Sequence, residues 1–383
     1  MKKYQICLLL ALASVGAVPN ASINYKAPTA LVKYAESRGV KFERMSTDSA
    51  SLYQLLFKLA YGVKDQTYFD YTDRKNVEER LDNARIASAL SQIARTGKWE
   101  PAVAQLEPKS GEYRLLSRRL AQIYTKPGEQ TRLLTMSVNG HRLLNRFSHY
   151  DRMLHINIPQ GRLNVIDKGS EVRLSMAVKV GSSVRRTPRF YTAVRQVNLF
   201  PYWTAPAGEV KSYLDQIHAN TIGPKYFAAR KKDGRRFDFS DKLFRNISVK
   251  KFNKRYWLKR EPGADNPLGV VRINFHQSFE DIYLHDTNER KAFCDSPTMA
   301  SHGCIRLQKP LTLTNLLLAS RSDWRPLKYA DHGCYQVPAA GIKPENKPYL
   351  VKGVIPVFVT YFPAFGKNGG VAYRDVYKKF TQQ

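Results

Sequence analysis

Acidic residues, cysteines and long apolar runs are all scarce in this chain. Its 383 residues include 32 Asp and Glu against 62 Lys and Arg, which gives a formal net charge of +30. Such a charge attracts polyanions: nucleic acid, anionic lipid head groups or a carboxylate-rich polymer. The apolar run Ile6–Val18 has 13 residues, well short of the roughly 20 that span a bilayer, and no later run is longer. We therefore expect no transmembrane segment.

The N-terminus has the pattern of a secretory signal peptide. Lys2 and Lys3 precede the apolar run, and small residues follow at Ala17 and Ala21. A basic start, a short apolar core and small cleavage-site residues are typical of signal peptides, so we expect one at residues 1–21. Export makes nucleic acid a poor partner for the basic chain and an extracytoplasmic polyanion a good one.

Removal of that segment leaves only three cysteines, namely Cys294, Cys304 and Cys334. An odd number in an oxidising compartment suggests one disulfide and one free, reactive thiol. The cysteine count does not say which of the three is free. That choice depends on the residues around each one.

The hydrophobic pattern predicts an α+β fold. Apolar residues recur with a period near 3.6 in Ser51–Leu59, Val77–Ile93 and Tyr113–Tyr124, which predicts helices in the first third of the chain. From Met153 the pattern changes to alternation, clearest in Glu171–Val180. Further strands are expected at Phe190–Val197, Val270–Phe275, Ile282–His285 and Val354–Phe362, with helices at Val210–Ile217 and Leu311–Leu318.

The segment Lys225–Arg255 is unusually basic, with 12 Lys and Arg against 3 Asp and Glu and six interleaved aromatic residues. Surfaces of this composition can bind nucleic acid by stacking and backbone contacts, but the expected export argues against that use. A flap over an anionic substrate and a plain surface insertion are both left open, and the flap is slightly favoured.

The most informative constellation joins His285 to Cys304. A thiol becomes a good nucleophile when a nearby imidazole accepts its proton, and the imidazole needs an acceptor on its other nitrogen. His285 ends an expected strand, and Asp286 can orient it through its carboxylate or its carbonyl. Gly303 lets backbone N–H groups approach a substrate carbonyl. Arg306 adds a fixed positive charge suited to a substrate carboxylate.

The tripeptide His302-Gly303-Cys304 is not sufficient evidence by itself, because His332-Gly333-Cys334 repeats it. Nineteen residues before Cys304 stands His285, whereas nineteen before Cys334 stands Asn315, within an apolar helix pattern. Cys334 therefore lacks an upstream base. It is a candidate disulfide partner for Cys294, while a pairing of either with Cys304 is left open.

His285 followed, after fifteen residues, by Ser301-His302-Gly303-Cys304 resembles the signature of the L,D-transpeptidase (YkuD-type) catalytic domain. The likeness to the long, scaffold-bearing Gram-negative branch extends to further blocks: Val180-Gly181 with Thr187-Pro188, Asn198–Pro206, Asn266–Gly269, Tyr283–Asp286, and Pro356–Tyr377. It implies a helical scaffold at 22–148, a mostly β catalytic domain at 149–363 with a capping insertion at about 208–256, and a C-terminal extension at 364–383. No separate peptidoglycan-binding module is found between Thr125 and Met153.

The resemblance implies acyl transfer on peptidoglycan stem peptides in the periplasm. Cys304 would attack the carbonyl of meso-diaminopimelate and release D-alanine, with His285 moving the proton. The resulting thioester would pass to the amine of another stem, giving a 3-3 cross-link. Gly303 and Cys304 amides would hold the oxyanion, with His302 and Asp286 in support. Tyr283, Ser301 and Arg306 would contact the substrate. No cofactor is expected, and cell-wall synthesis proteins are candidate partners.

Three alternatives are left open. The same thioester can be resolved by water, by a free D-amino acid or by a lipoprotein, giving a carboxypeptidase, an exchange enzyme or a lipoprotein ligase. A wall-binding scaffold with a structural Cys304 would have no activity. A zinc site of His276, His285, His302 and Cys304 is disfavoured, because the spacing lacks the usual short paired-ligand pattern, and no metal is expected.

Overall fold

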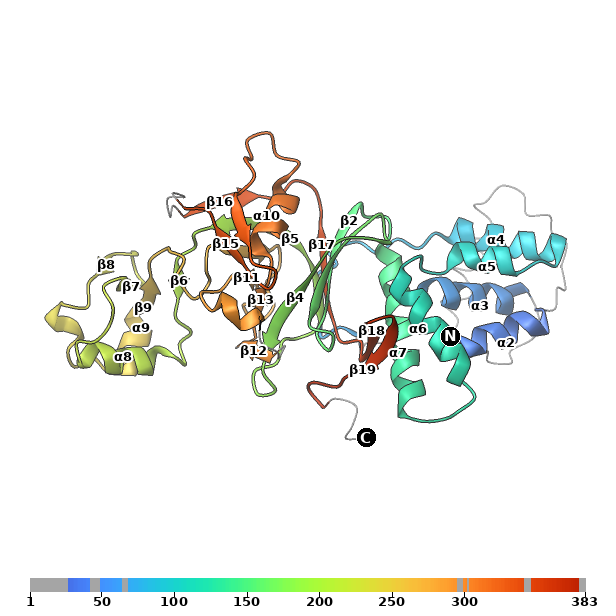
Figure 1. Ribbon diagram of the computed structural model, residues 1–383, viewed down its shortest axis with the longest axis horizontal. Coiled ribbons are helices and arrows are strands. Elements are labelled where there is room, and N and C mark those ends of the chain that lie inside the picture. The colour runs from blue at the N-terminus through green and yellow to red at the C-terminus, as the bar shows by residue number, and fades with distance from the viewer. Residues whose placement is uncertain are drawn as a thin grey trace. The chain divides into compact units, whose positions relative to one another are not determined.

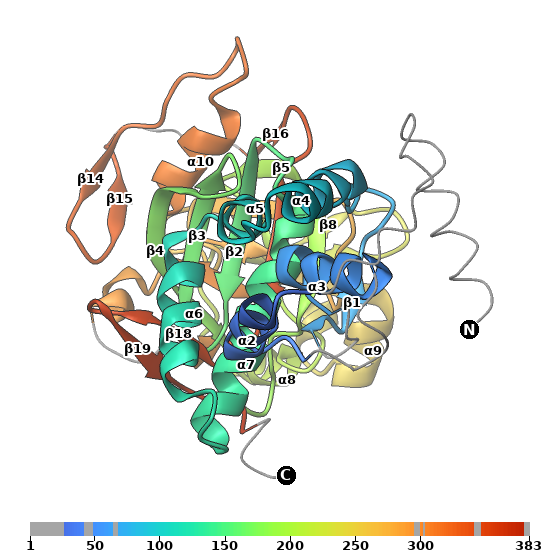
Figure 2. The same ribbon diagram turned by 90° about the vertical axis from the view of Figure 1, so that its right-hand side faces the viewer.

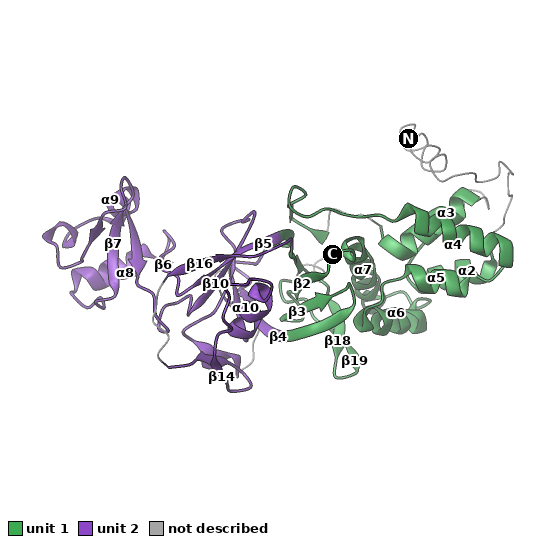
Figure 3. Cartoon of the chain, turned by 90° about the horizontal axis from the view of Figure 1, so that it is seen from above, with its two compact units in different colours: residues 1–175, 188–192, 355–383 green, residues 176–187, 193–354 purple. Residues whose placement is uncertain are grey.

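The computed structural model describes residues 27–41, 49–63, 68–294, 299–301, 303–340 and 346–378. These residues form two compact units (Figure 3). Unit 1 contains the described residues up to Ser175, Pro188–Thr192 and those from Ile355 onward; unit 2 contains Met176–Thr187 and Ala193–Val354. The domain boundary predicted at residue 149 therefore falls inside unit 1. The expected signal peptide at 1–21 lies outside the described residues.

Helices dominate the first part of unit 1 (Figure 1). In order they are α2 Thr29–Ser37, α3 Ser49–Tyr61, α4 Asn83–Thr96, α5 Glu100–Leu106, α6 Gly111–Ile123, α7 Glu129–Leu144 and the 3-10 turn η2 Asn145–Phe147. Side-chain caps start two of them: Asp82 accepts from the Arg85 N–H at α4, and Ser110 accepts from the Tyr113 N–H at α6. The three predicted helices are present, although α4 begins at Asn83 rather than at Val77.

Helix α7 lies within the helical scaffold expected at 22–148, but the periodicity of the sequence did not identify it as a separate helix. It contains Gly140, a residue that weakens helices in isolation. A Cβ at Gly140 would lie only 2.2 Å from the Phe362 ring, so the glycine makes room for that side chain. Close packing against buried Phe362 thus supports a helix that local propensity does not predict.

Unit 1 also carries strands β1 Tyr71–Thr72, β2 Arg152–Asn157, β3 Arg162–Asp167, β17 Pro356–Thr360, β18 Ala364–Lys367 and β19 Gly370–Tyr373. β2 pairs antiparallel with β3, as the alternation predicts, and parallel with β17. β18 and β19 form a separate hairpin. Two longer strands, β4 Glu171–Gly181 and β5 Phe190–Leu199, begin in unit 1 and end in unit 2.

The main sheet of unit 2 positions the candidate site. Its central strands run in the order β5, β10, β11, β13, β4. The new elements here are β10 Val271–Phe275, β11 Leu284–His285, η4 Arg290–Phe293, β12 Met299–Ser301, β13 Ile305–Leu307, α10 Pro310–Leu318 and β16 Lys347–Leu350. β14 Tyr329–Asp331 and β15 Gln336–Pro338 form the hairpin at the left of Figure 2. The expected α+β class is confirmed.

A second, smaller sheet of unit 2 has the order β6-β9-β7-β8, and two of its strands, β7 and β8, come from the basic segment. Its elements are β6 Trp203–Thr204, α8 Val210–His218, β7 Tyr226–Arg230, β8 Arg236–Phe237, η3 Lys242–Phe244, α9 Val249–Arg255 and β9 Tyr256–Arg260. Phe244 and Phe252 are fully buried, and Tyr226, Phe237 and Phe239 pack around them. These aromatic residues therefore form the core of a small subdomain rather than an exposed stacking surface.

Candidate active site

Strand register gathers the polar side chains of the site on one face of the main sheet. β11 pairs with β10 and with β13, so His285 stands opposite Arg272 on one side and Arg306 on the other. Directly paired residues project to the same face, and their chain neighbours to the other. Leu284, Ile305 and Ile273 accordingly fill the core, each with 0% exposure. One face of the sheet is hydrophobic, and the other carries the chemistry.

His285 is buried and its ring is held by the backbone. Its Nδ1 forms a hydrogen bond with the carbonyl oxygen of Asp286. Because a carbonyl can only accept, Nδ1 carries the proton and Nε2 is left as a proton acceptor. Burial lowers the pKa of His285 to about 3, helped by the charges of Arg306 and Arg272. The imidazole is therefore neutral at neutral pH.

The Asp286 carboxylate does not serve the imidazole. It is 1% exposed, and its Oδ2 accepts from the Val270 N–H at 2.9 Å and pairs with Arg290 Nη2 at 2.5 Å. Burial raises the pKa of this carboxyl, while Arg290 opposes the rise. Gly269 has φ +57°, and a Cβ there would meet Oδ2 at 2.2 Å. Asp286 thus ties the loop before β10 to the strand that bears His285.

Cys304 is the free cysteine among the residues that the structure describes, and it is half-buried just before β13. Its thiol donates to the Asp281 carbonyl at 3.7 Å and is also hydrogen-bonded by Tyr283. Burial raises the pKa of the thiol, and the hydrogen bonds from Tyr283 and the charge of Arg272 act against that rise. Both shifts favour the neutral forms, a thiol at Cys304 and a neutral imidazole at His285, over a thiolate and an imidazolium.

The turn that brings Asp281 to the thiol has an uncommon backbone. Glu280 and Asp281 have φ values of +51° and +55°, a region that residues other than glycine rarely occupy. Strained backbone of this kind clusters at functional sites. Here it precedes Tyr283 and His285 directly, which places the strained turn at the centre of the candidate site.

The loop before Cys304 is fixed from two sides. Ser301 Oγ donates to the Cys304 carbonyl at 2.5 Å and accepts from the Gly303 N–H at 3.2 Å. Thr187 Oγ1 donates to the Gly303 carbonyl at 2.7 Å and accepts from the Gly181 N–H at 2.9 Å. The Gly303 N–H already donates to Ser301 Oγ. Of the Gly303 and Cys304 N–H groups, only that of Cys304 therefore has no acceptor among the described residues.

Arg306 and Tyr283 have different surroundings. Arg306 Nη1 pairs with Glu289 Oε2 at 2.6 Å. The centre of the Tyr283 ring lies 5.6 Å from the centre of the His285 ring and 4.0 Å from the guanidinium carbon of Arg272.

His302 lies outside the described residues, so its expected supporting role stays a prediction. The roles assigned from sequence to Ser301, Gly303, Tyr283 and Arg306 also stay predictions.

Sequence reasoning missed Arg272 and Thr187 as members of the site. The alternation Val271, Arg272, Ile273, Asn274, Phe275 does place Arg272 on the polar face of its strand. That pattern could have identified it, because a charged residue inside a central strand needs a partner or a function. Thr187 stands in one of the blocks that carry the family resemblance, but nothing in the sequence indicated its hydrogen bonds.

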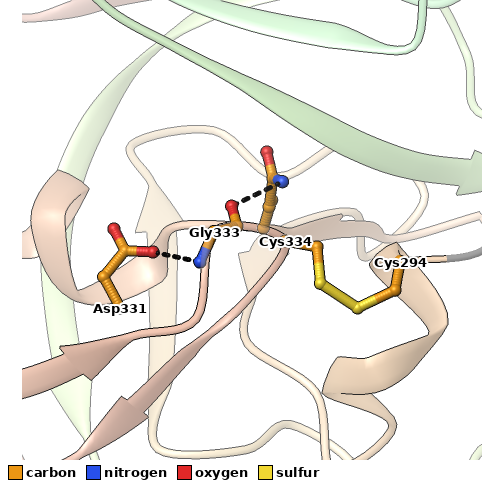
Figure 4. The surroundings of a disulfide bond; sticks show 5 residues. Cys294, Asp331, Gly333 and Cys334 are labelled. Carbon is orange, nitrogen blue, oxygen red and sulfur yellow. Dashed lines mark hydrogen bonds between the residues drawn. A yellow bond between two sulfur atoms is a disulfide. The ribbon is translucent and has the colours of Figure 1, made fainter.

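Cys294 and Cys334 are joined by a disulfide in unit 2, with a Cα–Cα distance of 5.1 Å (Figure 4). Cys294 follows η4, and Cys334 lies in the turn between β14 and β15. Gly333 in that turn donates its N–H to Asp331 Oδ1 at 2.8 Å. The disulfide therefore links the segment between His285 and Cys304 to a hairpin 40 residues further along the chain.

The described residues contain neither a metal-binding cluster nor a membrane-spanning helix. No group of three or more His, Cys, Asp or Glu side chains among them lies close enough together to hold a metal ion. Likewise, none of the helices in the described ranges has the length and apolar character that a membrane span requires.

Comparison with known proteins identifies a matching family model, a relative and a solved structure. The family model for the YkuD L,D-transpeptidase catalytic domain matches residues 151–323. A Haemophilus influenzae protein named "Putative L,D-transpeptidase" is 26% identical over 330 residues, covering 81% of this chain but only 63% of the relative. An L,D-transpeptidase structure from Mycobacterium smegmatis matches 55% of this chain and 58% of its own, at 12% identity and a TM-score of 0.25, too low to bear on the fold. This chain therefore contains a region, residues 151–323, that is similar to the YkuD L,D-transpeptidase catalytic domain.

Proposed function

We propose that this protein forms 3-3 cross-links between peptidoglycan stem peptides through a thioester on Cys304. One observation carries the proposal: the Asp286 carbonyl holds His285 with Nδ1 protonated, so that Nε2 is free to accept a proton. The parallel pairing of β11 with β13 supports the proposal, because it sets His285 opposite Arg306, two residues after Cys304. A positioned base beside a thiol is the arrangement that nucleophilic catalysis needs.

The reaction proceeds in two halves. His285 Nε2 takes the Cys304 proton while Sγ attacks the carbonyl of meso-diaminopimelate in a tetrapeptide stem. The C–N bond to D-alanine breaks, and the same proton passes to the leaving amine. The side-chain amine of a second stem then attacks the thioester carbonyl and loses a proton to His285; the C–S bond breaks, and His285 returns the proton to Sγ. The Cys304 N–H is the available donor for the oxyanion.

The charge of the chain fits this substrate. L,D-transpeptidases act on peptidoglycan, whose stem peptides carry several carboxylates. A net charge of +30 attracts such a polymer and speeds encounter with it. The expected signal peptide supports a periplasmic location, where both the polymer and an oxidised Cys294–Cys334 pair would exist.

Incubation of the purified protein with disaccharide-tetrapeptide, followed by mass spectrometry of the products, tests the proposal. We expect dimers that have lost one D-alanine from wild-type protein and none from Cys304→Ala. A Cys294→Ala/Cys334→Ala protein, which keeps Cys304, is the matched control and should still form dimers. Tripeptide without dimer would indicate a carboxypeptidase instead, and dimers from Cys304→Ala would refute the proposed nucleophile.

A further inference from the structure

Arg272 is an arginine at the centre of the candidate site whose charge is not balanced by an acidic residue among those described. It stands directly opposite His285 across the β10–β11 pair, and opposite Asn198 across the β10–β5 pair. Its Nε donates to Asn274 Oδ1 at 2.7 Å. Its terminal nitrogens have no hydrogen-bond acceptor within the described part of the chain.

Arg306, on the other side of His285, differs in this respect. Glu289 already neutralises it through a 2.6 Å ion pair, and the Arg306 side chain is 18% exposed. A substrate carboxylate at Arg306 would have to displace Glu289. Of the two arginines that flank the imidazole, Arg272 is therefore the one with unused charge and unused donors.

The Arg272 guanidinium is also held in place before any ligand arrives. Its carbon lies 4.0 Å from the centre of the Tyr283 ring, within the range of a cation–π contact. Asn274, which accepts from Nε, is itself fixed by Asn198 Oδ1 at 3.0 Å, and Gln196 donates to that same oxygen at 2.8 Å. A planar guanidinium fixed in advance loses less entropy on forming a forked pair with a carboxylate.

Tyr283 connects this guanidinium to the reacting sulfur. One face of its ring meets Arg272, and the tyrosine is also hydrogen-bonded to the Cys304 thiol. A group bound at Arg272 would thus lie one aromatic ring away from Sγ. In a tetrapeptide donor, carboxylates lie a few bonds from the scissile carbonyl on both the leaving D-alanine and the diaminopimelate side chain.

We infer that Arg272 binds a carboxylate of the donor stem peptide and so sets which peptide bond reaches Cys304. This inference rests on the proposed function and names the donor recognition of that same site. These two carboxylates, the ones nearest the scissile bond, have the chemistry that an arginine fork recognises. The experiment separates them by replacing one or the other with a carboxamide.

Binding to inactive protein provides the test without requiring turnover. Titration calorimetry would compare Cys304→Ala, Cys304→Ala/Arg272→Gln and Cys304→Ala/Arg272→Lys with the free tetrapeptide and with the two carboxamides. A hydrogen bond to a charged group corresponds to a loss of about 10- to 100-fold in affinity. We expect that loss when Arg272 is changed to Gln, a smaller one for Lys, and a comparable loss when the recognised carboxylate is amidated. Exposed Arg325, changed to Gln, is the matched control and should leave affinity unchanged.

The decisive feature is non-additivity. Once the recognised carboxylate is amidated, Arg272→Gln should cause no further loss, and the carboxamide that shows this identifies the carboxylate. An equal loss from Arg272→Gln with the free peptide and with both carboxamides would overturn the inference. If Arg272→Gln does not fold, the same cycle with Arg272→Lys decides. Failure of wild-type protein to form dimers while the cycle still shows coupling would refute the proposed function but not the carboxylate site.

Discussion

His285 takes its orientation from the backbone carbonyl of Asp286 and not from the Asp286 carboxylate. The carboxylate instead accepts hydrogen bonds from the Val270 N–H and from Arg290. The two functions of this residue are thereby separated. The main chain fixes the tautomer of the base, and the side chain holds the β10 loop.

The first prediction follows from that separation. Asp286→Asn keeps the carbonyl but leaves Arg290 without its buried anion, so we expect stability to fall by about 3 kcal/mol. Alkylation of Cys304 by iodoacetamide in the folded protein should change less than about threefold. Urea unfolding and alkylation kinetics measure the two effects. The control is Asp323→Asn, which breaks an exposed pair with Arg321 and should not change stability. A large loss of thiol reactivity at unchanged stability would assign the orienting role to the carboxylate.

The second prediction concerns pH. Burial raises the pKa of the Cys304 thiol above its usual value and lowers that of His285 to about 3. Between roughly pH 6 and 8 neither group titrates, so the thiolate fraction should rise about tenfold for each pH unit. Alkylation of Cys304 by iodoacetamide should follow that slope, without an inflection near the ordinary pKa of histidine. A plateau across the same interval would indicate a preformed thiolate–imidazolium pair instead.

The third prediction tests the hydrogen bond from Tyr283 to the thiol. Removal of the hydroxyl in Tyr283→Phe takes away one of the groups that lower the pKa of Cys304. The alkylation rate at about pH 8 should therefore fall by about tenfold. Tyr202→Phe, at a residue that is 40% exposed, is the matched control and should leave the rate unchanged. Equal rates for the wild type and both variants would show that Tyr283 does not tune the thiol.

The fourth prediction concerns the disulfide. Cys294 and Cys334 are 40 residues apart, and closing a loop of that length stabilises a protein by about 4 kcal/mol in the chain-entropy estimate. Reduction with dithiothreitol in a Cys304→Ala background should lower the stability of unit 2 by up to that amount. Hydrogen exchange in β15 and α10 reports on this unit directly. Unchanged protection after complete reduction would show that the disulfide does not constrain the fold.

Much of the fold could be predicted from periodicity, and the remainder depended on tertiary packing. Alternation identified β4, although its burial does not alternate throughout, since Val172 is 53% exposed and Lys179 is buried. The sequence spacing of His285 and Cys304 identified the candidate site. Periodicity did not identify helix α7 within the expected helical scaffold, and there packing against Phe362 outweighs the poor helix propensity of Gly140.

The aromatic residues of the basic segment and the site arginines show a second limit. Composition does not distinguish a stacking surface from a small core, and Phe244 and Phe252 belong to the core. Alternation could place Arg272 on the polar face but could not say which arginine was neutralised. That depended on Glu289, which is 17 residues away from Arg306 in the sequence.

The assignment of Cys304 as nucleophile and His285 as its base can be checked by the intact mass of the protein after mixing with a tetrapeptide donor. We expect the wild-type protein to gain the mass of the donor less D-alanine, as a thioester mapped to Cys304. Cys304→Ala should gain no mass. His285→Gln should acquire the adduct at least about 100-fold more slowly than the wild type. An adduct on any other residue, or an unchanged rate in His285→Gln, would contradict the assignment.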